Sequence, residues 1–264
     1  MRNVYVLGSI NMDMVITTPY IPAKGETLIG SNFFLNGGGK GANQAVATAK
    51  QNVNTYLIGN VGDDVFGNDL LDNLNKYNVN TKFTNKISNV STGVAVIVVH
   101  NNDNRIILDC GANHKVTYTQ IDEALINASE NDIFITQLEN NEDAVIYGLK
   151  AAKSHKMITI FNPAPAKVLD SKVYEYVDYL IINETECEII TNLYPDDNNK
   201  IIEAYNKLGI KNLVITLGSS GSILVRENKI IKINPNKVNA VDTTAAGDTY
   251  IGVFASQLIK NKNV

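Results

Sequence analysis

The residue pattern with the clearest chemical potential lies near the end of the chain, where VDTTAAGDT spans Val241 to Thr249. Apolar residues between 251 and 259 then recur at helical spacing, so we expect a helix that begins near Ala246. The start of a helix presents unpaired N–H groups and the positive end of the helix dipole. Because Ala245, Ala246 and Gly247 carry almost no side chain, a phosphate could approach those N–H groups closely.

Asp248 would lie beside an anion bound at this helix start. A carboxylate there repels phosphate, so its presence is explained if it accepts the proton of an attacking hydroxyl. The alternative interpretation is an ordinary capped helix, with Asp248 in a first turn that favours acidic residues. The preceding Asp-Thr-Thr and a glycine-rich stretch towards the other end of the chain favour the catalytic interpretation.

That glycine-rich stretch, NGGGKGAN, runs from Asn36 to Asn43. It contains a relaxed dinucleotide fingerprint, but such a fingerprint should follow the first strand directly, and here a strand-rich segment intervenes. It is not a P-loop either, because Lys40 is followed by Gly41 rather than by Ser or Thr. We interpret it as a turn that lets backbone approach a small ligand, with Lys40 and Asn43 as polar contacts.

The elements that must position these residues are strands with polar residues at their ends. Val4 to Gly8 is a short apolar run typical of a buried parallel strand, and Asn11 and Asp13 lie just beyond it. These two side chains could bind the hydroxyls of a small polyol, or form an Asx turn. Strands expected at 133–137, 157–161, 179–182 and 212–216 are likewise followed by polar or glycine-rich residues, including Glu139.

Strands that alternate with helices predict an α/β fold with a doubly wound, mostly parallel sheet. Two further segments, at about 14–36 and 90–110, contain strand-like runs broken by Pro, Gly or Asn, and they predict a small β-sheet lid over the site. The chain has 264 residues, of which 44% are hydrophobic and 19% charged. This size and composition fit a single α/β domain over 1–264.

The composition excludes several classes of function. A formal net charge of −4 gives no electrostatic case for binding nucleic acid or an anionic membrane. No apolar run reaches the roughly 18 residues of a membrane span, and the N-terminus lacks the pattern of a signal peptide. The cysteines, Cys110 and Cys187, lie far apart, so we expect a reduced, cytoplasmic protein.

Asn183 and Glu186 stand three residues apart, where a helix is expected to follow the strand at 179–182. The same pair could hold a hydrated Mg²⁺, which prefers few direct carboxylates together with water and phosphate oxygens. The spacing also fits a capping box at the start of a helix. Taken alone, it favours the capping box.

Considered together, the motifs resemble those of the ribokinase-type family of sugar and nucleoside kinases, from Val4 to the last residue. The motifs are GSINMD (8–13), GGKGANQA (38–45), STGVA (91–95), NPAPA (162–166), NETE (183–186), TLGSSG (216–221) and VDTTAAGDT (241–249). The resemblance implies an enzyme that uses ATP to phosphorylate D-ribose at its 5-hydroxyl. The alternatives are a kinase for deoxyribose, another sugar or a nucleoside, and, in a different class, a sugar-binding pseudokinase.

The resemblance also implies a role for each candidate residue. Asp248 is implied as the catalytic base, with the backbone of Ala245, Ala246 and Gly247 as the anion hole. The implied substrate-binding residues are Asn11, Asp13, Gly39, Lys40, Asn43, Glu139 and Asp248. The implied nucleotide-binding residues are Asn183, Thr216, Gly218, Ser219, Gly221 and Gly247. Glu186 is implied in the Mg²⁺ network of ATP, and Asp242 and Thr244 in a K⁺ site that supports the anion hole.

Two further expectations come from the family. Lids of this family can pair subunits, so a homodimer through the lid is implied. Members of the family normally continue past the helix of the anion hole, with further helices that wall the adenine pocket, whereas the given sequence stops at Val264. We therefore expect residues 1–264 alone to bind ATP less well than ribose.

Overall fold

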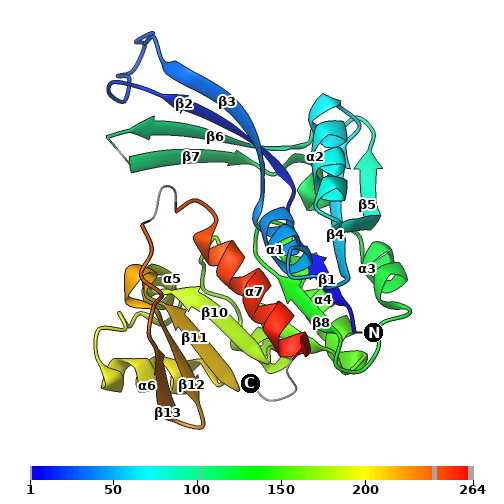
Figure 1. The fold of residues 1–264 in the computed structure, drawn as a ribbon, viewed down its shortest axis with the longest axis vertical. Coiled ribbons are helices and arrows are strands. Elements are labelled where there is room, and N and C mark those ends of the chain that lie inside the picture. Colours follow the sequence, from blue (N-terminus) through cyan, green and yellow to red (C-terminus); the bar gives the residue numbers. More distant parts are fainter. Residues whose placement is uncertain (1, 102, 240–242, 261–264) are drawn as a thin grey trace.

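The computed structural model describes residues 2–101, 103–239 and 243–260, in which strands and helices alternate (Figure 1). The main sheet contains β1 (Val4–Leu7), β4 (Thr55–Gly62), β5 (Asn80–Ile87), β8 (Ile133–Thr136), β9 (Ile158–Phe161), β10 (Tyr179–Asn183), β11 (Asn212–Thr216), β12 (Ser222–Arg226) and β13 (Lys229–Ile233). The second sheet contains β2 (Asn11–Thr17), β3 (Ser31–Gly38), β6 (Gly93–His100) and β7 (Asp103–Asp109). The helices are α1 (Lys40–Ala49), α2 (Val65–Lys76), α3 (Tyr118–Leu125), α4 (Glu142–Ser154), α5 (Glu184–Thr191), α6 (Asn198–Leu208) and α7 (Ala246–Lys260).

The main sheet has the order β13-β12-β11-β10-β9-β8-β1-β4-β5. All neighbours from β11 to β5 run parallel, and only β12 and β13 run antiparallel at one edge. The chain extends the sheet outward from β1 through β4 and β5, and then restarts at β8 on the other side of β1. A crevice for a ligand forms where the strand order reverses in this way. The predicted doubly wound, mostly parallel sheet is thus confirmed.

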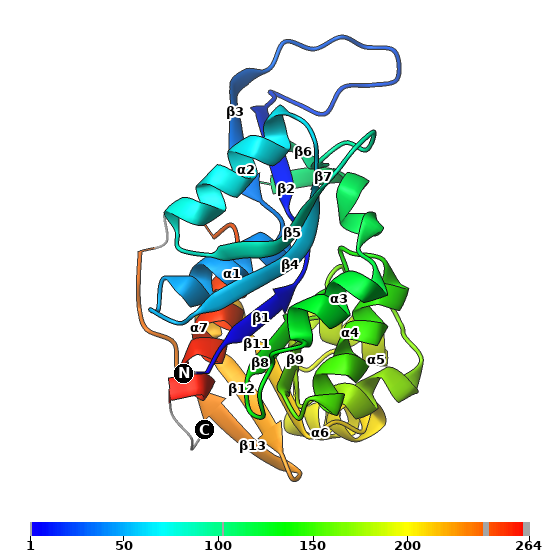
Figure 2. The same cartoon turned by 90° about the vertical axis from the view of Figure 1, so that its right-hand side faces the viewer.

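Helices cover both faces of the main sheet, as the side view shows (Figure 2). Side chains alternate along β1, so that Val4 and Val6 pack with α1, α2 and α7, whereas Tyr5 and Leu7 pack with α3, α4, α5 and α6. The period of two along a strand sends successive side chains to opposite faces, and each face needs its own helical layer. The inner parallel strands β1, β8 and β9 are largely apolar because both of their faces are buried.

The second sheet has the order β3-β2-β6-β7 and stands apart from the main sheet (Figure 1). The two segments expected to form a small sheet, at about 14–36 and 90–110, contribute its strands, and β6 pairs antiparallel with β7. Of the two alternatives for Asn11 and Asp13, the Asx turn is wrong: both residues lie on β2, where they pair with β3 and β6. Ile10 and Met12 are buried, and the alternation of these apolar residues with Asn11 and Asp13 is that of a strand.

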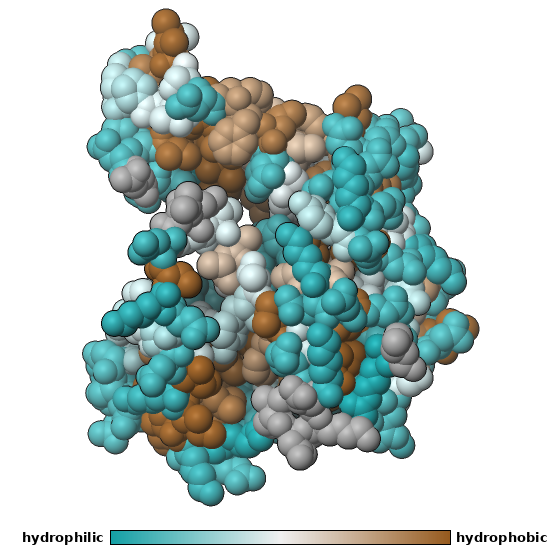
Figure 3. Space-filling view, viewed as in Figure 1, coloured by the Kyte–Doolittle hydropathy of each residue, from teal (hydrophilic) through white to brown (hydrophobic). Residues whose placement is uncertain are grey.

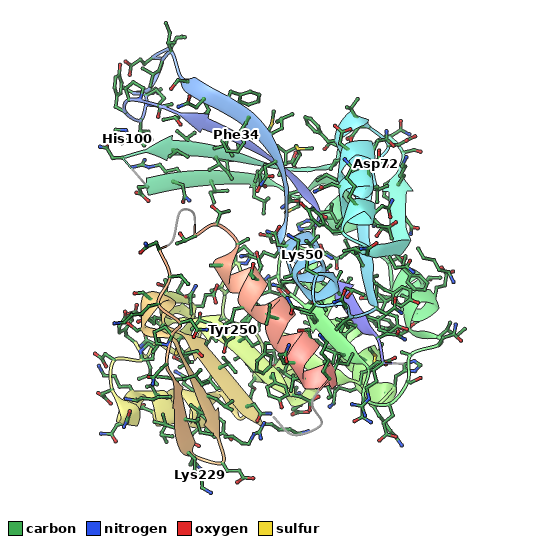
Figure 4. All side chains as sticks on the ribbon, viewed as in Figure 1. Phe34, Lys50, Asp72, His100, Lys229 and Tyr250 are labelled. Carbon is green, nitrogen blue, oxygen red and sulfur yellow. The ribbon has the colours of Figure 1, made fainter. Side chains whose placement is uncertain are left out.

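Helix α7 begins at Ala246, as predicted, and packs closely against α1. A Cβ atom built on Gly252 would lie 2.6 Å from Ala47 Cβ and 2.7 Å from the Gln44 carbonyl oxygen, so only glycine permits this approach. Tyr250 fixes the other side of α7, because its hydroxyl lies 3.0 Å from Ser222 Oγ on β12 (Figure 4). The N-terminal half of α7 is therefore held between α1 and the edge of the main sheet.

Within the described ranges, no helix has an apolar stretch long enough to cross a membrane.

Candidate active site

The site lies at the carboxyl ends of the parallel strands, where β1, β8 and the start of α1 meet. Glu139, which follows β8, accepts three hydrogen bonds on its Oε2 atom. Ser9 Oγ donates one, the Lys40 backbone N–H donates another at 3.2 Å, and Asn11 Nδ2 a third at 3.5 Å. Glu139 therefore ties β8, β2 and α1 together, as its position after a strand had suggested.

Asn113, which no sequence motif marks, supports this cluster through hydrogen bonds to Ile10 and Asn11. Its side chain is fully buried. Asn113 Nδ2 donates to Asn11 Oδ1 at 2.7 Å, and Asn113 Oδ1 accepts from the Ile10 backbone N–H at 2.9 Å. Because Asn113 occupies the amide oxygen of Asn11, it turns the amide nitrogen of Asn11 towards Glu139.

Asp13 lies on β2 with Gly38 beside it. A Cβ atom on Gly38 would lie 2.2 Å from Asp13 Oδ2, so the absence of a side chain there leaves the room for the carboxylate. Burial, with a smaller effect of the negative charge of Glu139, raises the pKa of Asp13 to about 6. These two half-buried carboxylates are suited to accept hydrogen bonds from ligand hydroxyls.

Gly39 forms the sharp entry into α1, with φ at +89°. A Cβ atom there would lie 2.8 Å from both the Asn11 nitrogen and the Ser9 carbonyl oxygen. Any other residue would therefore be strained and would push the two segments apart. The helix that follows presents Lys40 and Asn43, the two residues predicted as polar contacts.

Asp248 lies in the first turn of α7 and is 8% exposed. Asn43 Nδ2 donates to its Oδ2 atom at 3.2 Å, and Gln44 Nε2 donates to its Oδ1 atom at 2.9 Å. Burial raises the pKa of Asp248 above its ordinary value, while Lys40, Gln44 and Asn43 act in the opposite direction. The structure thus joins Asp248 directly to the residues of the glycine-rich turn, from which it is separated by about two hundred residues.

The predicted small residues stand at the start of α7, but one of their N–H groups, that of Ala246, already has a hydrogen-bond acceptor. Ala245 has a positive φ of 55°, and the Ala246 N–H already donates to the Thr243 carbonyl at 3.1 Å. A Cβ atom on Gly247 would meet nothing within 4 Å. Protein packing therefore does not require glycine at position 247. The close approach of a ligand to the Gly247 N–H would require it.

A cleft extends from this helix start towards the ends of β10 and β11. Its lining includes Lys40, Asn162, Asn183, Glu186 and Thr216, together with residues 245–248. Figure 3 shows the molecule hollowed between the second sheet and the body below it. Of the predicted nucleotide-binding residues, Asn183, Thr216 and Gly247 line this cleft, whereas Gly218, Ser219 and Gly221 belong to the turn after β11 and are not part of its described lining.

Asn183 and Glu186 form the capping box of α5, with reciprocal bonds of 2.7 and 2.9 Å. The same two residues line the cleft, so the capping role does not remove them from it. Burial raises the pKa of Glu186, against the opposing effects of the Asn183 N–H and the charge of Lys40, and Asp248 raises it further. The Asn183 N–H holds one oxygen of the Glu186 carboxylate, and Lys40 is close enough to act on its charge. A carboxylate held in this way could bind a hydrated metal ion that accompanies a phosphate chain.

Asp242 and Thr244 are the two residues predicted for a K⁺ site. Asp242 lies outside the described residues. Thr244 is exposed, just before the first turn of α7.

Comparison with known proteins gives consistent matches over the whole chain. The family described as pfkB family carbohydrate kinase matches residues 1–264. A ribokinase of Bacillus subtilis is 37% identical over 264 residues, which cover 100% of this chain and 88% of the relative. A deoxyribokinase of Salmonella typhi is 35% identical over 267 residues, covering 99% and 87% of the two chains. The structure of Arabidopsis thaliana ribokinase complexed with ribose and ATP is similar with a TM-score of 0.89, at 30% identity, over 98% of this chain and 86% of that one.

Proposed function

Because the chain belongs to the pfkB family of carbohydrate kinases, we propose that it transfers the terminal phosphoryl group of ATP to the 5-hydroxyl of D-ribose. The observation that carries the proposal is the position of Asp248. On one side its carboxylate interacts with the charge of Glu139 in the polar cluster and accepts from Asn43 of α1, and on the other its helix start lines the cleft of Glu186. An acceptor hydroxyl and a phosphate would therefore meet at Asp248.

In this proposal the polar cluster holds the sugar. Asn11, Asp13 and Glu139 bring amide and carboxylate groups that accept from or donate to ring hydroxyls, and Asn43 reaches from α1. Gly39 and Lys40 bring backbone close to the sugar, because the glycine permits a tight entry into the helix. A free pentose fits such a site better than a hydrophobic substrate would, because every buried polar group must find a partner.

Asp248 then acts as the general base. Its carboxylate takes the proton of the 5-hydroxyl while that oxygen forms its bond to the γ-phosphorus, and the bond to the oxygen that bridges the β- and γ-phosphates breaks to release ADP. The start of α7, around Ala245, Ala246 and Gly247, would stabilise the charge of the transferring group through the positive end of the helix dipole and the Gly247 N–H, while the Ala246 N–H donates to Thr243 within the turn. Lys40, which also lines the cleft, adds a positive charge.

The triphosphate would occupy the cleft towards Asn183 and Thr216, and Gly218, Ser219 and Gly221 would border the nucleoside beyond it. Mg²⁺ bound to ATP would be held near Glu186 through its water shell, and would supply charge neutralisation on the phosphates. We also include K⁺ near Thr244 and Asp242 as an activating ion. Potassium dependence is measured by replacing it with a large organic cation at fixed ionic strength, and an unchanged rate would reject the K⁺ site.

The second sheet would act as the lid, and as the dimer interface of a cytoplasmic enzyme. Hydrophobic side chains gather over it in Figure 3, and the exposed ones on its strands include Phe33, Phe34, Leu35, Val96, Ile106 and Ile107. By the strand register, Leu35, Val96 and Ile107 share one face of this sheet, and Phe34 and Ile106 share the other. Exposed apolar side chains of this kind are suited to contact with a second copy of the chain. Covering these side chains would also exclude water, which competes with the sugar as phosphoryl acceptor.

The experiment is an ADP-release assay with ATP, Mg²⁺ and a panel of D-ribose, 2-deoxy-D-ribose and adenosine. We expect the highest kcat/KM with ribose; a higher value with deoxyribose would instead favour the second candidate, which the similarity to a deoxyribokinase supports. Asp248→Asn should lower kcat by roughly 10²–10⁴-fold with little change in ribose binding. Near-normal turnover of this variant would contradict the role of Asp248, and ribose binding without turnover by the unaltered chain would indicate a pseudokinase.

A further inference from the structure

Two buried glutamines connect Asp248 to the interior of the main sheet. Gln44 on α1 is 0% exposed, and Gln137, just after β8, is 1% exposed. Gln44 Nε2 donates to Asp248 Oδ1 at 2.9 Å, and Gln137 Nε2 donates to Gln44 Oε1 at 2.6 Å. The three side chains therefore form one continuous chain of hydrogen bonds that reaches from the centre of the fold to the cleft.

The direction of this chain follows from the charge of Asp248. An ionised carboxylate can only accept hydrogen bonds, so Gln44 must turn its amide nitrogen towards it. The amide oxygen of Gln44 then faces Gln137, which in turn must present its own nitrogen. The orientation of each amide is thus set by its neighbour, and the ionised state of Asp248 matches all of them.

The chain of hydrogen bonds through Gln44 and Gln137 carries a cost in stability, because it leaves one buried amide oxygen without a partner in the part of the protein that the structure describes. Among the described residues, Gln137 Oε1 has no hydrogen-bond partner although it is buried. It also needs space, because a Cβ atom on Gly8 would lie only 2.3 Å from it. Buried acceptors without a partner are unfavourable and rare, and they concentrate where function requires them.

We propose that Gln44 and Gln137 are positioning residues, which hold the Asp248 carboxylate ionised and aimed at the acceptor hydroxyl. This inference rests on the proposed role of Asp248 as the base. Gln44 supplies the donor, and Gln137 holds the amide of Gln44 in the orientation that donates. Asn43 supplies a second donor at the other oxygen, but it belongs to the sugar-facing side of α1.

The physical basis is the balance of effects on the Asp248 carboxylate. Burial raises its pKa and Glu139 adds to this, whereas Lys40 lowers it, followed by the donors Gln44 and Asn43. Glu186, on α5, is a further acidic group that interacts with Asp248 across the cleft. When the donor of Gln44 is removed, the carboxylate keeps its burial and its acidic neighbours, so it binds a proton at a higher pH. A protonated Asp248 cannot accept the hydroxyl proton.

The test is the pH dependence of kcat and of kcat/KM for the sugar in Gln44→Met, which keeps the length and burial of the side chain but removes its donor. We expect the acidic limb of both profiles to move up by about one to two pH units, since a hydrogen bond to a charged group has this effect on a pKa. The loss of kcat should shrink as the pH rises, and KM for the sugar should change little.

Gln137 is tested through its effect on Gln44. Gln137→Met should move the acidic limb in the same direction by a smaller amount. The double variant Gln44→Met/Gln137→Met should behave as Gln44→Met alone, because Gln137 acts only through Gln44. Additive shifts would contradict the proposed chain, and Gln137→Met keeps the proposal testable if Gln44→Met does not fold.

The matched control is Gln120→Met. Gln120 is a buried glutamine of α3, which covers the opposite face of the main sheet from α7, and it donates to the Gly59 and Phe83 carbonyl oxygens. It should lower the urea midpoint but leave the acidic limb in place. If Gln44→Met folds and the acidic limb of its pH profiles does not shift, although Asp248→Asn is inactive, the positioning role of Gln44 is wrong. Full turnover of Asp248→Asn would instead contradict the proposed function, in which Asp248 is the base.

Discussion

Asp13 is expected to destabilise the ligand-free protein at neutral pH, and this can be measured. Burial and the nearby Glu139 raise its pKa from 3.8 to about 6. Between these two values the folded state binds more protons than the unfolded state, so the free energy of unfolding falls as the pH rises through this window. The destabilisation is absent below about pH 3.8 and complete above about pH 6.

The size follows from the shift. About 6 minus 3.8 is about 2 pH units, and at about 1.4 kcal/mol per unit this gives about 3 kcal/mol. Asp13 is only half-buried, so water screens part of the effect, and we expect about 1–3 kcal/mol. Asp13→Asn keeps the shape but removes the charge, so it should raise the free energy of unfolding by this amount at pH 7.5 and by much less at pH 4.5.

The assay is urea unfolding of the ligand-free protein at both pH values, with Asp72→Asn as the control. Asp72 is an exposed carboxylate on α2, well away from the site (Figure 4), and its replacement should have little effect at either pH. Calorimetry should show that Asp13→Asn weakens ribose binding although it stabilises the fold. If Asp13→Asn lowers stability equally at both pH values, the reasoning from burial and charge is wrong.

Four further variants test individual parts of the site. Asn113→Leu leaves the Ile10 N–H and the Asn11 amide without their partner, so it should lower stability by about 1–3 kcal/mol and weaken ribose binding in calorimetry; unchanged ribose binding would contradict its supporting role. Gly252→Ala should cost about 1–3 kcal/mol of unfolding free energy, because its Cβ would overlap α1. Gly247→Ala should unfold like the unaltered chain, since a Cβ there meets nothing within 4 Å, yet turn over slowly because the methyl group obstructs the phosphate; normal turnover would reject the anion hole. Phe34→Ser, at a side chain that is 53% exposed on β3, should weaken dimerisation in sedimentation velocity, and an unchanged distribution would argue against the second sheet as an interface.

The order of strands and helices could be predicted where apolar runs are strong. The expected strand at 212–216 matches β11, and the predicted helix start at Ala246 matches α7. Strand β5, with the sequence NTKFTNKI, was not predicted, because this edge strand is polar and only part of it is buried. Strand β2 begins earlier than expected because its functional polar residues alternate with apolar ones, and a search for apolar runs misses such a strand.

The parts of the site that could not be predicted depend on contacts between distant segments. Gln44 stands in an alanine-rich helix and Asn113 in a short turn, and neither has a local pattern that marks it. Their importance arises only because the fold brings Gln44 to Asp248 and Asn113 to Asn11. A motif gives the type of residue, whereas the partner that orients it is determined by the tertiary structure.

The charges of the site explain why ligand binding and the stability of the fold should be coupled. Burial raises the pKa of three acidic side chains in the site, Asp13, Asp248 and Glu186, so each is held in a place that disfavours its charge. Lys40 faces two of them but cannot offset all three. Sugar hydroxyls that donate to these carboxylates, and a divalent cation near Glu186, would stabilise the charged form of the carboxylates and so oppose the rise in pKa that burial causes. The same acidic residues that make the empty site less stable therefore provide the free energy with which it binds its ligands.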